Sequence, residues 1–365
     1  MLFTIVVKLV LAIIMYSFVM GLAALLTWME RKESAVMQDR IGANRADVLG
    51  FRAWGLFHII ADSVKMMLKE DFIPPFSNKL IHNLAPLISV LFALLAFACI
   101  PFGGTLKIYG KEITLQIANL NIALLFIFAT LSLGIYGVIL GGWSSFNKWA
   151  IISSQRAVAQ LLSFGFALAA IFISIVMVYD TFNLQVISQK QGELLFGFIP
   201  KWGIFLQPLG FILFLIVGIA ETKRIPFDLP EGESEVIGYF VEYSGLKFGM
   251  FFLTDFVETI LISALTVVFY LGSYQIPYLG ATGFVFPGGF QIALPHIVVV
   301  LLQVIAFGIK VFIGCWFLLL VRWTLPRFRY DQMMKLGWEQ VVPLSIINIF
   351  ITAIIILYAK GALNL

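Results

Sequence analysis

The 365-residue chain has few charged side chains, since aspartate, glutamate, lysine and arginine together make up only 12% of it. Soluble globular proteins carry roughly twice that fraction, about 25%. Cysteine and histidine are also rare: Cys99 and Cys315 lie in separate apolar runs, and His58, His82 and His296 are scattered. Iron–sulfur clusters, haem and zinc need such ligands at close, regular spacings. The spacing therefore excludes these centres, and we expect both cysteines to be small buried hydrophobic side chains.

Nucleotide-binding motifs are absent as well. The sequence contains neither the glycine-rich strand-to-helix turn of dinucleotide-binding domains nor a phosphate-binding loop. It also shows no tandem repeat, no low-complexity tract and no soluble domain. Such a chain can shape a cavity, bind an apolar molecule and move protons, so we expect any redox cofactor to belong to another subunit.

Apolar residues dominate instead, at 61% of the chain with a mean hydropathy of +1.00. This composition is typical of an integral membrane protein, and we predict a single all-α membrane domain over residues 1–365. The first apolar run ends in Glu30-Arg31-Lys32 without a cleavage site, which favours a retained span over a signal peptide. The uncharged, glycine-rich stretch from Leu271 to Leu294 predicts a compact loop. Runs of about twenty apolar residues predict eight transmembrane helices, near 5–28, 84–104, 119–142, 151–178, 203–220, 249–272, 294–321 and 341–359.

The basic residues are distributed unevenly among the seven loops. Sixteen lie in or beside the odd-numbered loops, and four, Lys107, Lys111, Lys190 and Lys201, in the even-numbered ones. The positive-inside rule then places the odd loops in the cytoplasm and both termini on the opposite side. Basic residues at the membrane edge also account for the net charge of +4, so the charge does not indicate a nucleic-acid partner.

The first cytoplasmic loop contains an amphipathic pattern from Trp54 to Glu70, before Pro74-Pro75. We predict a helix lying along the membrane interface, although an inert amphipathic lid is an alternative interpretation. Its apolar residues recur at steps of three or four, at Phe57, Ile60, Val64, Met67 and Leu68, whereas Asp62, Lys65 and Lys69 fall elsewhere on the turn.

The longest polar stretch runs from Glu221 to Lys247, between two apolar spans, and holds five glutamates and Asp228. In a soluble protein it would be interpreted as a solvated loop, but carboxylates beside a membrane are few unless they have a function. Within the spans, Asp255 and Glu258 share one helix face, and we expect two such close carboxylates to hold at least one proton near neutral pH. The alternative is that they pair with Lys310 or with hydroxyls as fixed contacts between helices. Glu30, Arg31 and Arg322, at span ends, are by themselves typical of interfacial anchors.

Several different blocks of polar residues lie at the ends of the predicted spans. They are ERK at 30–32 with QDRIGANR at 38–45, then Asp62, Lys65 and KED at 69–71, GWSS at 142–145 with Asn147-Lys148, PFDLPE at 226–231, EYSGLKFG at 242–249, and RWTLPR at 322–327 with RYDQ at 329–332. In this order the blocks closely resemble the family of the membrane H subunit, also called subunit 1, of proton-pumping NADH:quinone oxidoreductase, respiratory complex I. The resemblance covers about residues 20–355.

The resemblance implies a subunit that joins the membrane arm to the peripheral redox arm of complex I, in a bacterial cytoplasmic membrane. Quinone, either ubiquinone or menaquinone, would be the substrate, while FMN and iron–sulfur clusters would belong to partner subunits. No residue here would be catalytic in the strict sense. Residues implied to line or support the quinone chamber are Glu30, Arg31, Arg40, Arg45, Asp62, Lys65, Phe227 and Asp228; those implied in proton coupling are Glu231, Glu233, Glu235, Asp255 and Lys310.

One position departs from the family pattern. The family carries a glutamate on the fourth span where this chain has Gly165, and Glu258 lies where the family does not usually have an acid. We therefore hypothesise that Glu258 takes over the role of the missing carboxylate, although Asp255 and the loop glutamates could suffice. Two other functions stay open: the homologous subunit of an energy-converting hydrogenase, which the helix ending in Lys69-Glu70-Asp71 disfavours, and a secondary transporter, for which no inverted repeat is visible.

Overall fold

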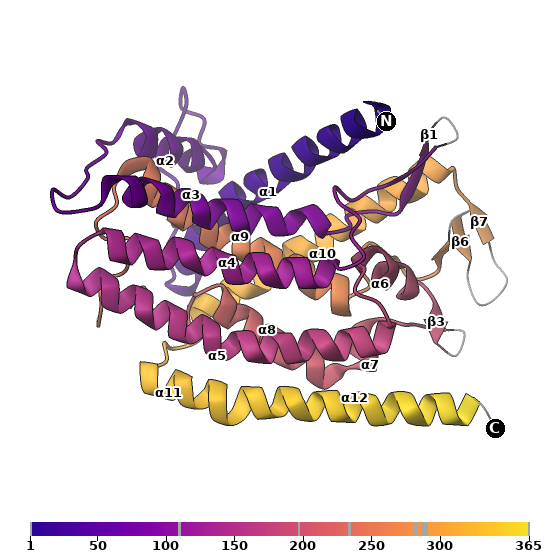
Figure 1. The fold of residues 1–365 in the computed structure, drawn as a ribbon. Helices are drawn as coiled ribbons and strands as arrows, with labels where there is room; N and C mark the ends of the chain where they lie inside the picture. Colours follow the sequence, from indigo (N-terminus) through magenta and orange to yellow (C-terminus); the bar gives the residue numbers. More distant parts are fainter. Residues whose placement is uncertain are drawn as a thin grey trace.

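The computed structural model describes residues 2–108, 111–195, 198–232, 235–280, 283–285 and 291–363. Within these ranges it is an all-α membrane protein with seven helices long and apolar enough to cross a membrane. Helices α3, α4, α5 and α12 lie side by side in that order, with α1, α9 and α10 packed behind them (Figure 1). The bounds are α1 Leu2–Met37, α3 Lys79–Ala96, α4 Ala123–Ser144, α5 Lys148–Tyr179, α9 Gly245–Tyr270, α10 His296–Thr324 and α12 Val342–Leu363.

Short turns extend two of these helices. The 3-10 turn Phe97–Cys99 continues α3, and α11, Tyr330–Lys335, runs through a π-helical turn at Leu336–Val341 into α12. Asparagine caps the N-termini of α3 and α5: Asn78 accepts a hydrogen bond from the Ile81 amide, and Asn147 accepts one from the Trp149 amide.

The segment predicted as a span at 203–220 is helical, but in two pieces, and it is not among the seven helices long enough to cross a membrane. Helix α7, Gly203–Leu206, ends at Gln207, whose backbone is not helical, and α8 begins at Pro208 and runs to Glu221. The 14 residues of α8 extend about 21 Å, less than the roughly 30 Å hydrocarbon core. The sequence thus predicted the position of this fifth apolar segment but not its interruption at Gln207.

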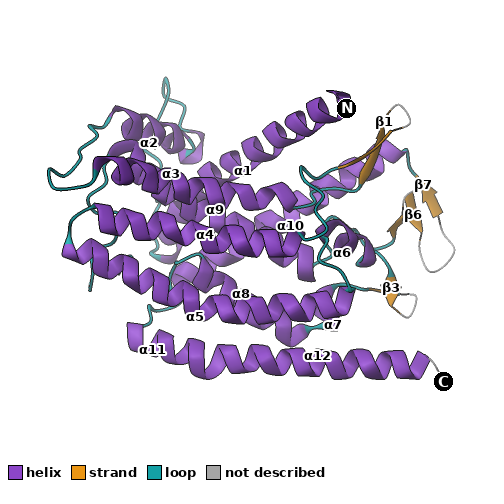
Figure 2. Ribbon diagram, in the orientation of Figure 1, coloured by secondary structure: helices purple, strands orange, loops and turns teal. Residues whose placement is uncertain are grey.

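The two ends of the bundle differ. At one end lies α2, Phe57–Leu68, after the 3-10 turn Ala53–Gly55. This helix forms within the predicted amphipathic stretch Trp54 to Glu70, and none of its residues is buried. At the other end, with both chain termini, lie α6, Leu184–Lys190, and the short strands (Figure 2). These are β1 Thr105–Ile108 with β2 Lys111–Thr114, β3 Leu194–Leu195 with β4 Ile199–Pro200, and the antiparallel set β5 Leu279–Gly280, β6 Gly283–Val285 and β7 Gln291–Ala293. The stretch expected to be only a compact loop therefore contains a small sheet.

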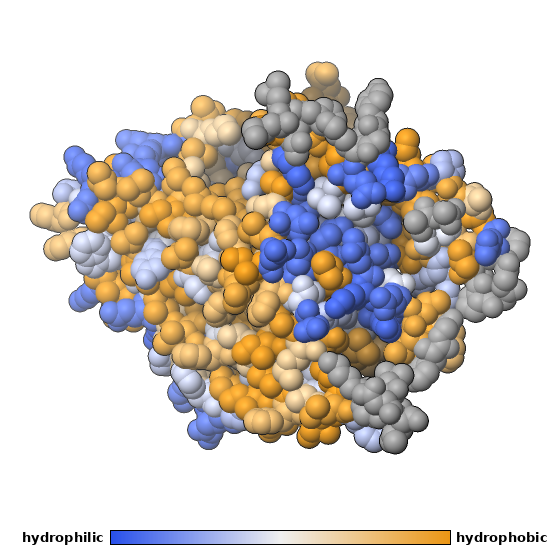
Figure 3. Space-filling model, turned by 45° about the vertical axis from the view of Figure 1, so that its right-hand side comes forward, coloured by the Kyte–Doolittle hydropathy of each residue, from blue (hydrophilic) through white to orange (hydrophobic). Residues whose placement is uncertain are grey.

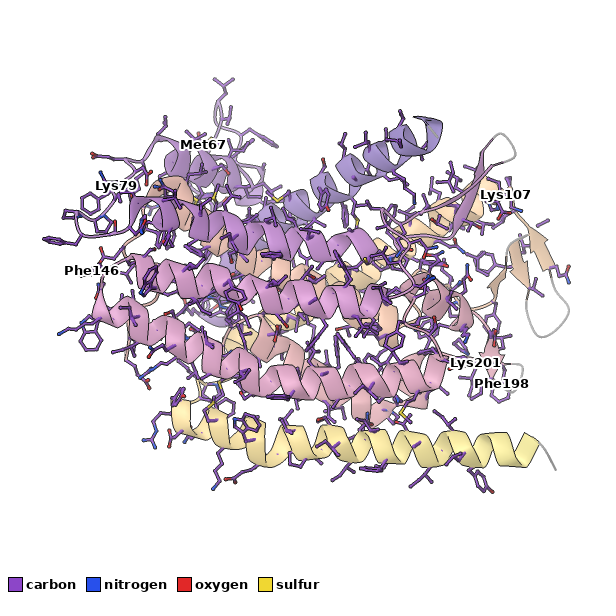
Figure 4. The ribbon with its side chains drawn as sticks, viewed as in Figure 1. Met67, Lys79, Lys107, Phe146, Phe198 and Lys201 are labelled. Atoms are coloured by element: carbon purple, nitrogen blue, oxygen red, sulfur yellow. The ribbon has the colours of Figure 1, made fainter. Side chains whose placement is uncertain are left out.

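The polar residues follow this division. Figure 3 shows a mostly apolar surface with hydrophilic side chains gathered on the strand end, which is turned forward, and more at the opposite edge. In Figure 4, Lys79 and Phe146 lie at the α2 end, whereas Lys107 and Lys201 lie at the strand end. The basic loops and the even-numbered loops thus occupy opposite ends of the bundle.

Helix α9 is the most enclosed of the seven long helices. In its most apolar 18-residue window, 89% is buried, because α1, α3, α8 and α10 all pack against it. Gly218 of α8 packs so closely against α9 that a Cβ there would be 2.5 Å from the Ile262 side chain. Ionisable side chains on α9 therefore lie in the protein interior rather than in lipid.

Candidate functional site

A cluster of buried ionisable residues lies where α1, α8, α9 and α10 meet the segment after α8. The side chains come from three helices and one loop, yet each residue is only 4–9% exposed. Buried charges are costly unless they are paired, so their contacts define the site. The members are Glu30, Glu221, Lys223, Arg224, Asp228, Asp255 and Glu258.

Glu30 of α1 forms the first part of the cluster. One carboxylate oxygen lies 2.6 Å from Arg322 of α10, and the other accepts a hydrogen bond of 3.1 Å from Arg224. The Arg224 guanidinium also lies 4.0 Å from the ring centroid of Phe256. Glu30 and Arg322, which taken alone suggested interfacial anchors, instead pair with each other and tie α1 to α10.

Asp228 forms the second part, in the loop after α8. It lies 2.6 Å from Arg327 and accepts a hydrogen bond from the Glu231 amide. Burial raises the pKa of Asp228 to about 6, against the opposing effect of the Arg327 guanidinium. Burial, together with the negative charges of Asp255 and Asp228, raises the pKa of Glu231 well above its ordinary value.

The backbone of this loop is held by α5. The Gln160 side chain donates hydrogen bonds to the carbonyl oxygens of Ala220, at 2.7 Å, and Phe227, at 2.8 Å. Ser153 donates another to the carbonyl of Pro230. Phe227 is buried and its ring stacks on Phe328 at 5.5 Å, so its side chain supports the loop from inside.

Lys223 forms the third part and points at α9. Its ammonium lies 2.9 Å from Glu258 and 3.8 Å from Asp255. Burial lowers the pKa of Lys223, but the carboxylates of Glu258 and Asp255 outweigh it and hold the pKa above its ordinary value. The expected alternative partner of these carboxylates, Lys310, is not their partner.

Lys310 lies elsewhere, at the C-terminal end of α9. Its ammonium donates hydrogen bonds to the carbonyl oxygens of Leu271, Ser273 and Gln275, at 2.7–3.0 Å, and lies 4.6 Å from the Trp202 ring. Leu271 is 13 residues beyond Glu258, or about 20 Å along a helix. Lys310 thus caps α9 rather than joining the cluster.

A more exposed set of charges joins α1 to α2. Asp62 of α2 pairs with Arg31 of α1 and lies 3.1 Å from Lys65. Beyond it, a cavity of about 600 Å³ lies between α2 and the segment 237–248. Its lining is mostly apolar with lysines at one side, and includes Lys65, Met66, Lys69, Ile237, Phe240, Tyr243 and Phe248.

The remaining predicted residues do not join either group. Arg40 and Arg45 are exposed, and the Arg40 side chain donates a hydrogen bond to the Gln38 side chain. Glu235 pairs with Arg156 of α5 at 2.6 Å, at the edge of the loop. Glu233 lies outside the described residues. Cys99 and Cys315 are buried free thiols, as expected.

Sequence reasoning missed Lys223, Arg224 and Glu221 as members of the site. All three were visible within the polar stretch that follows α8, where Glu221, Lys223 and Arg224 come directly after an apolar run. Their burial could not be predicted, because it depends on how far α8 sinks into the bundle. Within the described residues, no group of three His, Cys, Asp or Glu side chains is placed to hold a metal ion.

The fold and the site define a multi-pass helical membrane protein with a cluster of charged side chains in its interior. Comparison with known proteins identifies the family. The family described as NADH dehydrogenase matches residues 9–353. The chain therefore belongs to the family of the H subunit of NADH-quinone oxidoreductase, and is a component of an oxidoreductase complex.

Individual relatives cover nearly the whole chain. It is 41% identical over 332 residues to an H subunit of NADH-quinone oxidoreductase from Cytophaga hutchinsonii, covering 91% of each chain. It is 40% identical over 352 residues to the corresponding H subunit of Flavobacterium johnsoniae, covering 96% of this chain and 95% of the relative. The H subunit of Thermomicrobium roseum is 38% identical over 354 residues, covering 96% of both.

Proposed function

We propose that this subunit forms part of the quinone chamber at the junction with the peripheral arm and couples quinone reduction to proton translocation. The observation that supports this most is the succession of ionisable groups from the α2 cavity into the centre of the bundle. Asp62 and Arg31 lie near the cavity, Glu30 follows on α1, and Asp255 lies on α9, the most enclosed of the long helices. Charges so deep in a membrane protein mark ion or proton paths.

The cavity between α2 and the segment 237–248 suits an isoprenoid quinone. A quinone presents an apolar ring and tail with two carbonyl oxygens, and the lining offers aromatic and aliphatic walls with Lys65 and Lys69 at one side. Arg40 and Arg45, which are exposed here, would act at the surface that partner subunits cover. Those subunits would carry FMN and the iron–sulfur clusters, and the α2 end would face the cytoplasm in the bacterial membrane.

The loop after α8 would transmit the redox event. A doubly reduced quinone takes up two protons, and a change of charge near Asp228 and Glu231 alters their repulsion and the resting position of the loop. Glu231 lies within electrostatic range of Asp255, so the change reaches α9. Glu233 and Glu235 would complete this loop, and Lys310 would mark the far end of the path.

Photolabelling tests the chamber. In the assembled complex, a photoreactive quinone should label peptides from α2 and residues 237–248, and excess quinone should suppress that labelling. Labelling confined to other subunits would contradict the chamber role.

A cross-link tests the loop after α8. Arg156 and Glu235, whose side chains touch, are replaced with cysteines and joined by a short bismaleimide, which should abolish proton pumping. Full pumping with the loop locked would contradict coupling through it.

A further inference from the structure

The ammonium of Lys223 lies at the centre of a small group of acids. It contacts Glu258 at 2.9 Å and Asp255 at 3.8 Å, and Glu221 of α8 lies within electrostatic range. The backbone of Lys223 is left-handed, with φ of +54°, a conformation that residues with a Cβ rarely adopt. A buried lysine in a disfavoured backbone conformation is held there by its partners.

The two carboxylates on α9 are not equivalent partners. Glu258 both lies close to the ammonium and accepts a hydrogen bond from it, at 3.2 Å to its second oxygen. Asp255 is almost one ångström further from the ammonium. Its Oδ1 has no hydrogen-bond partner, and neither has Oε2 of Glu258. Glu258 is therefore the closer, hydrogen-bonded partner of Lys223, whereas the buried Asp255 carboxyl is held less tightly by it.

This asymmetry gives Glu258 a different role from the one that the sequence suggested. We propose that Lys223 and Glu258 form a self-compensating buried ion pair that positions Asp255 and leaves it as the proton-exchanging carboxyl at this level of α9. The inference deepens the proposed function and rests on it. Both members of the pair are positioning residues, and Glu258 is a counter-ion rather than a substitute for the carboxylate missing at Gly165.

Neutralising either member of the ion pair alone should then impair proton exchange at Asp255, for a different reason in each variant. In Glu258→Gln, the uncompensated ammonium turns to Asp255 and holds it ionised. In Lys223→Gln, two carboxyls face each other on one helix face without a cation, so their titrations become coupled. The double variant has neither an uncompensated ammonium nor a second carboxyl facing Asp255.

The test is a double-mutant cycle in the assembled complex, reconstituted in vesicles. Quinone reduction and proton uptake should fall about tenfold in Lys223→Gln and in Glu258→Gln, and their pH profiles should shift relative to wild type. The double variant should recover both activities to within about twofold of wild type. A double variant as impaired as Glu258→Gln would overturn the proposal and favour Glu258 as a proton carrier.

Two further variants keep the outcome decisive. If the neutral variants do not assemble, the exchange Lys223→Glu with Glu258→Lys keeps an ion pair, and its failure to restore pumping would equally overturn the proposal. Asp255→Asn distinguishes a failure of the proposed function from a failure of the ion-pair proposal. Normal pumping in Asp255→Asn would refute the proposed function itself, whereas loss of pumping there without rescue in the double variant would refute only the ion pair.

Discussion

At the scale of single residues, Glu30 has the most demanding position, because it is the shared partner of the buried Arg224 and the half-buried Arg322, which lie on different elements. Replacing it with glutamine would leave Arg224 and Arg322 without a counter-charge. Breaking a buried pair in this way costs about 3–5 kcal/mol. We expect Glu30→Gln to lower the amount of assembled complex and its inactivation temperature.

The matched control for Glu30 is Glu339, whose carboxylate lies 3.8 Å from Lys335 in a pair where both side chains are more than half exposed. Such pairs contribute about 0–1 kcal/mol, so Glu339→Gln should leave assembly unchanged. Equal effects of the two substitutions would show that the burial of Glu30 does not determine its importance.

Asp228 supports a prediction about pH. Because its pKa is raised from 3.8 to about 6, the folded protein holds this proton more tightly than the unfolded chain does. The contribution of this proton to the free energy of unfolding is complete below pH 3.8 and is lost as pH rises through about 6. It amounts to at most about 3 kcal/mol. Asp228→Asn removes this dependence.

Thermal inactivation measures the effect. The half-life of wild-type complex, divided by that of the Asp228→Asn complex, should fall as pH rises from about 5 to about 7. A ratio that rises over this range would mean that Arg327 stabilises the charged carboxylate more than burial opposes it.

At the scale of elements, the junction of α2 with α9 depends on Gly245. Its φ is +57°, and a Cβ there would lie 3.0 Å from the carbonyl oxygen of Lys69. Ser244 donates a hydrogen bond to the Glu70 carbonyl, and Lys247 lies 2.6 Å from Asp71, so both neighbours fasten the same junction. We expect Gly245→Ala to cost about 1–2 kcal/mol and to increase proteolysis between residues 40 and 75.

Gly165→Ala is the control for this substitution. A Cβ at Gly165 would meet nothing within 4 Å, and its φ is not in the left-handed region. It should leave protease resistance and quinone reduction unchanged. Resistance of Gly245→Ala equal to that of the control would contradict the proposed tight contact between α2 and α9.

The same scale shows what the sequence could predict. Apolar runs and steps of three or four residues placed the long helices and α2 within a few positions, because membrane span length and amphipathic periodicity are local properties. The break at Gln207 and the small sheet around Phe284 carried weaker local signals. The alternative that Asp255 and Glu258 pair with Lys310 is wrong, and Lys223 was not considered as their partner. Its contact with Asp255 joins residues 32 positions apart and depends on how the loop after α8 folds back.

At the scale of the whole molecule, the protein is an apolar bundle with charge concentrated near one end and along its central helix. Asp62 and Arg31 lie at the α2 end, Glu30 links α1 to α10, and Asp255 lies in the most buried helix. On the function proposed above, this arrangement would let a reaction at the α2 end change proton occupancy in the interior.

The most direct test is proton translocation by the assembled complex carrying Asp255→Asn, reconstituted in vesicles. NADH oxidation by a soluble artificial acceptor, measured in parallel, reports the integrity of the peripheral arm. We predict that quinone reduction and proton uptake both fall about tenfold, while electron transfer to the artificial acceptor is unchanged. Quinone reduction and proton uptake at wild-type rates in the fully assembled variant would contradict the account.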